Sequence, residues 1–186
     1  MAQNARLLKR VQRLEKEIAN HQASRVRADR HSSNSTGTLA EDYVCKLLGG
    51  KATERNADHD LVIGRRRFEI KGSKCNMFYS GVYSYTRWTW HNFLGIGSKK
   101  TFHRLILVGE ADPAHRSTYR DPRSPYVIFD VPVSFAKEVA ASRARYGSIF
   151  TFQLISHRDG AKTSALCKKM WDYEVTRSEL KDRYRT

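Results

Sequence analysis

The chain has 186 residues, 40% of them hydrophobic, and a formal net charge of +15 at pH 7, which suits one domain with an appendage and a polyanionic partner. It has no apolar run long enough to span a membrane, its charged N-terminus argues against a secretory signal, and its three cysteines are too far apart in sequence for a cysteine zinc site or a disulfide framework. We therefore expect a protein of the cytoplasm or the nucleoid, with no membrane partner.

Residues 1–36 are expected to form a basic N-terminal extension, and residues 37–186 the main domain. A helix is predicted over residues 5–21, because Leu7, Val11, Leu14 and Ile18 follow heptad spacing. This helix either packs on its own domain, or dimerises two chains, or lies along DNA. Residues 25–36 are polar and lack an apolar period, so they are predicted to be a linker or a loop.

A second helix is predicted to begin at the capping box of residues 38–41. Thr38 would bond the backbone N–H of Glu41, and Glu41 would reach back to the start of the helix. The residues that follow place one apolar face on this helix: Leu39, Tyr43, Val44, Leu47 and Leu48. Gly49 and Gly50 are expected to end it.

Residues 59–63 and 66–71 are predicted to be two short strands joined through Gly64 and Arg65. Side chains alternate between the two faces of a strand. Phe68 and Ile70 would therefore point into the core, whereas Glu69 and Lys71 would point to the other side. If the two strands pair antiparallel, Asp60 lies beside Glu69.

The remaining pattern predicts an α/β or α+β fold, with one mixed sheet flanked by helices. Residues 86–94 favour a short helix that begins at Thr86 and ends at Gly95, with a strand as the alternative because Trp and Thr favour strands. The other expected elements are strands at 52–55, 104–108, 126–130 and 149–155, a loop at 112–125, a helix at 134–145, and a C-terminal helix opened by a capping box at Thr176.

Asp60, Glu69 and Lys71 together supply the parts of a metal-dependent phosphodiesterase site. Mg²⁺ prefers hard oxygen ligands and can be held by one or two carboxylates, because it keeps several of its waters. A bound metal neutralises the scissile phosphate and lowers the pKa of the attacking water, and a nearby lysine stabilises developing charge. The backbone carbonyl of Ile70 is a candidate further ligand. The alternative for Glu69 and Lys71 is an ordinary solvated strand face.

In three segments, the chain resembles the PD-(D/E)XK nuclease superfamily. The resemblance is carried by the segments GTLAEDYVCKLLGG (37–50), HDLVIG (59–64) and FEIKGS (68–73), although His59 stands where the family often has proline. It implies a restriction-endonuclease-like core. It further implies that Asp60 and Glu69 bind Mg²⁺, with Mn²⁺ as a possible substitute, that Lys71 acts on the attacking water, and that Glu41 is an accessory acidic residue.

Glu41 has a second interpretation, since the capping box accounts for it without catalysis. The candidates for contact with nucleic acid are Arg65, Arg66, Ser73, Lys74 and Arg87, for each of which a plain surface role is the alternative. Tyr79, Tyr83 and Tyr85 lie in a glycine-containing stretch that would approach DNA.

The sequence thus predicts a Mg²⁺-dependent endonuclease that cuts double-stranded DNA as a homodimer. A sequence-specific enzyme of the restriction type is the first expectation, because two-fold protein symmetry matches a palindromic site. A structure-selective resolvase, a repair nuclease and a homing endonuclease are the alternatives within the enzyme class. A non-catalytic nucleic-acid-binding protein is the alternative outside it.

Overall fold

The computed structural model divides the chain into two units, Met1–Ser35 and Thr36–Thr186. The structure describes residues 36–53, 57–81, 83–92, 94, 100–143, 151–160 and 164–185. The predicted helix at 5–21 and the linker that follows it, apart from Thr36, lie outside the described residues.

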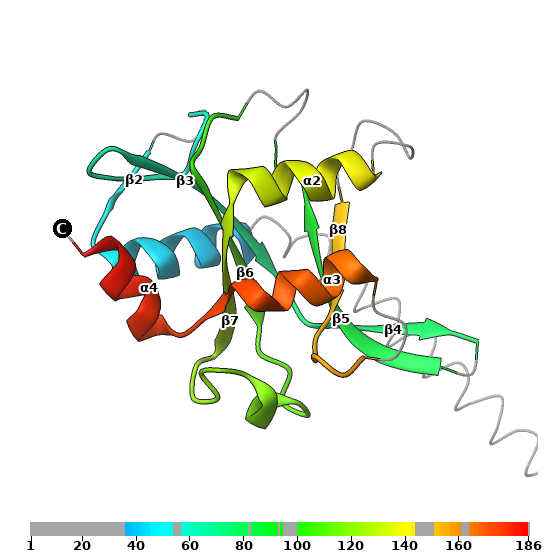
Figure 1. Ribbon diagram of the computed structural model, residues 1–186. Helices are drawn as coiled ribbons and strands as arrows, with labels where there is room; N and C mark the ends of the chain where they lie inside the picture. The colour runs from blue at the N-terminus through cyan, green and yellow to red at the C-terminus, as the bar shows by residue number, and fades with distance from the viewer. Residues whose placement is uncertain are drawn as a thin grey trace, which may run out of the picture. The chain divides into compact units, whose positions relative to one another are not determined.

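The second unit contains two sheets (Figure 1). The larger has the strand order β1 (Lys51–Ala52), β2 (Leu61–Ile63), β3 (Arg66–Ser73), β6 (Arg104–Glu110), β7 (Tyr126–Pro132) and β9 (Glu174–Val175). The smaller has the order β4 (Asn76–Ser80), β5 (Tyr83–His91) and β8 (Thr151–Ile155). In the larger sheet β3 and β6 pair in parallel, whereas the other pairs are antiparallel. The predicted α/β class with a mixed sheet is confirmed, whereas the prediction of one sheet is wrong, because β4, β5 and β8 form a second sheet. The restriction-endonuclease-like arrangement stays a prediction.

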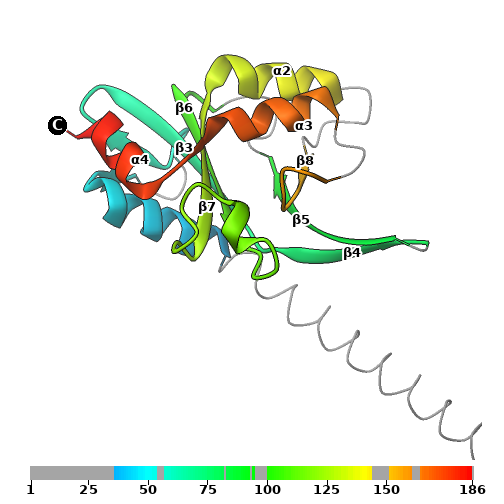
Figure 2. The same ribbon diagram turned by 60° about the horizontal axis from the view of Figure 1, so that its bottom comes forward.

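Helices cover both faces of the six-stranded sheet (Figures 1 and 2). One face carries the helix of residues 36–48 and α4 (Arg177–Tyr184), which share a buried apolar cluster with β3 and β6. The other face carries α2 (Val133–Arg143), α3 (Ala165–Met170) and the smaller sheet, around a second cluster. Short 3₁₀ helices occupy Arg116–Thr118 and Trp171–Tyr173.

The alternation of β3 places its residues on these two faces as the sequence predicts. Phe68 and Ile70 are buried in the cluster beneath the helix of residues 36–48. Glu69 pairs in register with Leu105, which belongs to the cluster on the opposite face. Glu69 and Lys71 therefore lie on the side of the large sheet that carries the smaller sheet.

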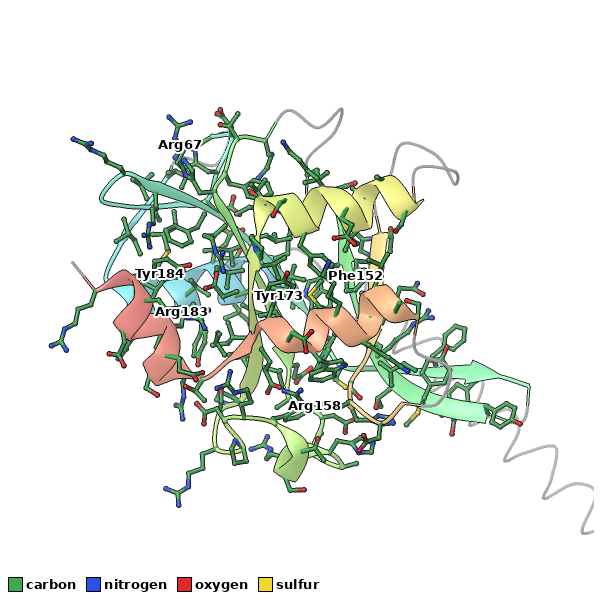
Figure 3. All side chains as sticks on the ribbon, viewed as in Figure 1. Arg67, Phe152, Arg158, Tyr173, Arg183 and Tyr184 are labelled. Atoms are coloured by element: carbon green, nitrogen blue, oxygen red, sulfur yellow. The ribbon has the colours of Figure 1, made fainter. Side chains whose placement is uncertain are left out.

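The smaller sheet is fixed to the larger one by the tryptophans of β5. The Trp88 indole N–H donates to the carbonyl of Glu110 at 2.8 Å, and the Trp90 indole N–H donates to that of Val108 at 3.2 Å. Gly109 leaves room for the Trp88 ring, since a Cβ there would lie 2.5 Å from it. Phe152 of β8 stacks on Trp90 inside this layer (Figure 3).

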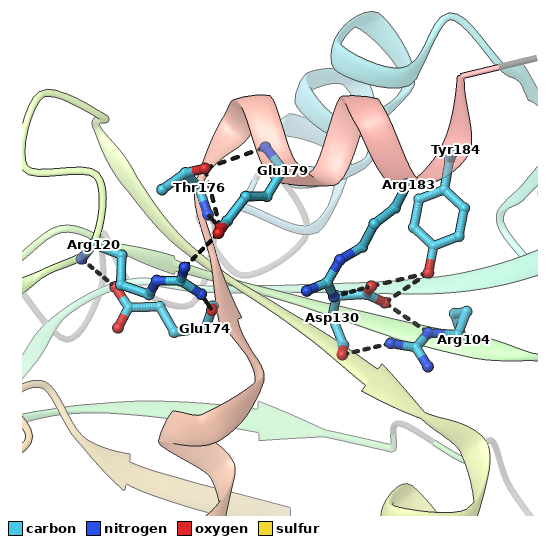
Figure 4. Close-up of polar contacts among 8 residues, drawn as sticks. All are labelled: Arg104, Arg120, Asp130, Glu174, Thr176, Glu179, Arg183 and Tyr184. Atoms are coloured by element: carbon cyan, nitrogen blue, oxygen red, sulfur yellow. Dashed lines mark hydrogen bonds and ion pairs between the residues drawn. The ribbon is translucent and has the colours of Figure 1, made fainter.

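Two buried carboxylates hold the C-terminal elements, and both are satisfied by arginines (Figure 4). Asp130 accepts hydrogen bonds from Arg104 at 2.7 Å, from Arg183 at 3.0 Å and from the Tyr184 hydroxyl at 2.9 Å. Glu174 accepts one from the backbone N–H of Arg120 at 2.8 Å and pairs with Arg158. Unpaired charges at such depth would be costly, so these arginines are structural.

Two local predictions are wrong. Residues 86–94 do not form a helix, because Trp88 and Trp90 are buried on one face of β5 while Thr89 between them is only half-buried on the other; the strand alternative is confirmed. Thr38 does not open a helix, since residues 36 and 37 are already helical. Gly49 ends that helix with φ of +68°, as predicted, and the capping box at Thr176 is confirmed.

Candidate active site

The β2–β3 hairpin brings Asp60 beside Glu69. The two strands pair antiparallel, with Leu61 opposite Phe68. The Asp60 N–H donates to the Phe68 carbonyl at 2.8 Å, and the Ile70 N–H donates to Oδ2 of Asp60 at 2.7 Å. The antiparallel prediction is confirmed. The backbone N–H of Ile70 thus orients the Asp60 carboxylate. The metal-binding role of the Ile70 carbonyl stays a prediction.

Glu69 is the fully buried carboxylate of this site. Burial raises its pKa from 4.5 to about 7, and the nearby charge of Asp60 acts in the same direction. Lys71 and Lys100 oppose the rise, but they do not cancel it. A cation that binds Glu69 would therefore compete with a proton for this carboxylate near neutral pH.

Lys71 lies two residues after Glu69 on the same face of β3, and the two side chains are in contact. Its Nζ lies 2.6 Å from Oε1 of Glu69. By its geometry the contact is an ion pair rather than a directed hydrogen bond, so Oε1 is held by the charge of Lys71 in the described part of the chain. A buried oxygen held in this way needs an explanation, and a bound ion would be one.

Lys100 is the member of the site that the sequence prediction missed. Its Nζ lies 2.7 Å from Oε2 of Glu69 and 3.3 Å from Oδ1 of Asp60. Burial alone would lower the pKa of Lys100, but its hydrogen bonds to Glu69 and Asp60 and their charges raise it above the ordinary value. The ammonium therefore bridges both carboxylates as a full positive charge.

Glu41 belongs to the helix of residues 36–48 and is near enough to feel the charges of Asp60, Lys71 and Lys100. That helix packs directly on the backbone of β3, since a Cβ at Gly72 would lie 2.6 Å from the Thr36 carbonyl oxygen and 2.7 Å from the Cβ of Ala40. Burial raises the pKa of Glu41, and the charge of Asp60 adds to the rise. Because Thr38 does not begin the helix, the capping box no longer accounts for Glu41.

The donor set fits a Mg²⁺ ion. Asp60 and Glu69 provide two carboxylates that already share one cation, and within the described residues Oε1 of Glu69 is held only by its ion pair with Lys71. Among the described residues, no three His, Cys, Asp or Glu side chains gather closely enough to hold a metal by themselves. Mg²⁺ does not require such a cage, because it keeps several waters and uses one or two carboxylates.

The candidate contacts to nucleic acid are spread over the molecule. Arg65 and Arg66 are exposed at the β2–β3 turn, and Lys74 is half-buried just after β3. The Arg87 guanidinium lies 3.7 Å from the Phe78 ring centroid and donates to Gln153. Ser73 is buried, and its hydroxyl accepts from the Thr89 N–H at 2.8 Å. It joins β3 to β5, which corrects the expectation that it touches phosphate.

Comparison of the chain with protein-family models, with curated proteins and with solved structures gives no match. Within the described residues, no helix combines the length and the apolar character that crossing a membrane requires.

Proposed function

We propose that the protein is a Mg²⁺-dependent endonuclease of the PD-(D/E)XK type that hydrolyses phosphodiester bonds in double-stranded DNA. The observation that carries the proposal is the ammonium of Lys100, which lies within 3.3 Å of an oxygen of Asp60 and 2.7 Å of an oxygen of Glu69. The two carboxylates thus converge on one point that already attracts a cation.

The partners of the three other buried carboxylates in the described residues support an exchangeable cation at this point. Asp130 and Glu174 are paired with arginines, and Asp112 accepts hydrogen bonds from the hydroxyls of Thr86 and Ser156. Among the described residues, Glu69 is neutralised by lysines alone, which act as compact point charges on flexible stems. A divalent ion can replace one ammonium there without dismantling the fold.

Each residue then has a distinct part in hydrolysis. Asp60 and Glu69 would hold the ion, whose chemistry is to neutralise the scissile phosphate and acidify water. Lys71, next to Glu69, would orient the attacking water and stabilise the charge that develops on the phosphate. Glu41 would accept a hydrogen bond from metal-bound water, and Ile70 keeps Asp60 in place through its N–H.

DNA is the favoured substrate because of the net charge of +15, which favours a polyanion over a small phosphate ester. Homodimerisation is part of the proposal, since two sites are needed to cut both strands of a duplex. The sequence-specific and the structure-selective modes of cutting remain the two candidates. The projecting β4–β5 hairpin favours the structure-selective mode.

The test is cleavage of supercoiled plasmid and of a branched duplex in Mg²⁺, in Mn²⁺ and in EDTA. We expect cleavage by the wild-type protein in either metal, none in EDTA, and none by Asp60→Ala, Glu69→Ala or Lys71→Ala, all of which should still bind DNA. Lys169→Ala is the matched control, since Lys169 forms an exposed ion pair with Glu138 at 2.9 Å, far from these residues in sequence. DNA binding by the wild-type protein without cleavage in either metal would leave a non-catalytic binding protein instead.

A further inference from the structure

The β4–β5 hairpin is a ribbon that extends away from the rest of the second unit (Figures 1 and 2). Four large hydrophobic side chains are exposed among the described residues, and three of them belong to this ribbon. Met77 is 53% exposed, Tyr79 71% and Tyr83 67%. Exposed aromatic groups gathered on one projecting element are typical of a binding surface.

The register places these side chains on both faces of the ribbon. Met77 and Tyr79 share one face, because they pair with Thr86 and Ser84. Tyr83 lies on the other face, where it pairs with Ser80. Side chains stand out from both sides of the ribbon into open space (Figure 3). A ribbon exposed on both faces is not a lid on its own domain.

The second face also forms a continuous row of flat groups. Phe78 and Tyr85 are paired, with ring centroids 5.3 Å apart. The Arg87 guanidinium lies over Phe78 at the root of the ribbon. Aromatic rings and guanidinium groups are the side chains on which unstacked bases stack.

The charges along the β4–β5 hairpin favour a polyanionic partner. The sequence has no aspartate or glutamate between Glu69 and Glu110, and residues 75–86 carry no charge at all. Lys74 and Arg87 flank this neutral stretch. The carboxylates of Glu110 and Asp112 reach the root of the ribbon from the large sheet, where they are hydrogen-bonded to Cys75 and Thr86. The rest of the ribbon adds no negative charge, so a polyanion would place its phosphates near Lys74 and Arg87 and its bases near the aromatic tip.

The ribbon is also rigidly joined to the candidate active site. The Ser73 hydroxyl, two positions after Lys71 on β3, accepts a hydrogen bond from the backbone N–H of Thr89 in β5. Thr86 bonds both Asp112 and Ser156, which fixes β5 at the point where the ribbon leaves the body. Glu69, Lys71 and the ribbon lie on the same side of the large sheet.

We propose that the β4–β5 hairpin is an aromatic wedge that stacks on unpaired or unstacked bases, so that the enzyme acts on branched DNA in preference to linear duplex. The inference rests on the nuclease function proposed above, and it names the substrate class of that site. Tyr79 and Tyr83 are the stacking residues, one on each face of the ribbon, and Met77 fills the space beside Tyr79.

The test compares a four-way junction with a linear duplex of the same arm sequence, by fluorescence anisotropy in EDTA. The Tyr79→Ala/Tyr83→Ala double variant is expected to bind the junction about tenfold more weakly or worse, because each stacked base contributes strongly to such binding. Its affinity for the linear duplex should be unchanged. Tyr79→Phe/Tyr83→Phe, which keeps both rings, should behave as the wild type, and Leu39→Ala is the control for loss of an exposed apolar side chain elsewhere.

A 2-aminopurine base at the branch point gives a direct readout, since stacking by the wild-type ribbon should quench it and the double alanine variant should not. Equal weakening on both DNAs, or no weakening on the junction, overturns the proposal. So does a double alanine variant that turns a dimer into a monomer on sizing, because the ribbon would then be a subunit interface. These assays need no metal, so absence of cleavage overturns the nuclease function and leaves the wedge standing.

Discussion

Lys100 and Glu69 lie 31 positions apart in the sequence, yet their side chains meet at 2.7 Å beneath the surface. The same ammonium reaches Asp60. The ammonium of Lys100 must compete with any metal ion that binds these two carboxylates from solution. The identity of residue 100 should therefore set how tightly the site binds metal.

Replacing Lys100 by methionine is expected to tighten binding of Mg²⁺ and Mn²⁺ about tenfold, since a charge-assisted hydrogen bond to a buried carboxylate no longer has to be broken. Isothermal titration of the protein without DNA measures the change. Lys169→Met, at an exposed ion pair, should leave the affinity as it is. Weaker metal binding in Lys100→Met would show that Lys100 builds the site rather than competing for it.

Glu69 should lower the stability of the metal-free protein as the pH rises. Its folded-state pKa of about 7 exceeds the ordinary 4.5, so its stabilising contribution is complete below pH 4.5 and is lost as the pH rises through 7. Between pH 4.5 and 8 the free energy of unfolding of the wild type should fall by about 3 kcal/mol more than that of Glu69→Gln. Urea denaturation in EDTA at both pH values provides the measurement.

The matched control for that comparison is Glu138→Gln, whose carboxylate is exposed on α2 and should leave the pH dependence of the wild type intact. An identical pH slope for Glu69→Gln and the wild type would contradict the burial of an ionisable Glu69.

Metal affinity should itself depend on pH, because a proton and a metal ion compete for Glu69. With a pKa of about 7, the ionised fraction changes about tenfold between pH 6 and pH 8, and the affinity for Mn²⁺ should rise by that factor. Electron paramagnetic resonance of free Mn²⁺ follows the titration. In Glu69→Gln the affinity should be low and nearly independent of pH over this range; a steep dependence there would assign the titration to another group.

Gly72 is expected to tolerate no side chain. A Cβ at this position would lie 2.6 Å from the Thr36 carbonyl oxygen, so the helix that carries Glu41 must move. Gly72→Ala should lower the free energy of unfolding by about 1–3 kcal/mol, as overpacked cores do, which thermal denaturation would detect. Gly37→Ala is the control, because nothing lies within 4 Å of its Cβ position and alanine favours the helix. Equal stability of both variants would contradict the close packing of this helix on β3.

Much of the site was predictable because its central part is local. The turn at Gly64 and Arg65 and the alternation of β3 place Asp60, Glu69 and Lys71 together within twelve residues. The capping box at Thr176 and the buried strands β6 and β7 follow from equally local patterns. Such features depend on neighbours in sequence, which a pattern can read.

The remainder depends on pairings between distant segments. Lys100 reaches the site because β6 lies parallel to β3, with Arg104 beside Phe68, and no spacing within a motif indicates this. Residues 86–94 fit a helix by their termini, but the burial of Trp88 and Trp90 against β6 decides for a strand. Strand β4 and helix α3 had no expected counterpart, since each is short and is held by the elements around it.

The parallel pairing of β3 with β6 also determines when the site can be completed during folding. The hairpin that holds Asp60 and Glu69 closes over a few residues and can form early, whereas β6 must return across a long crossover before it can pair. On a ribosome, Lys100 and β6 emerge after the acidic pair has already been synthesised. A nascent chain that stops short of Lys100 therefore carries both carboxylates with Lys71 but without the lysine that bridges them, and the full site appears only in a chain that has folded across its middle.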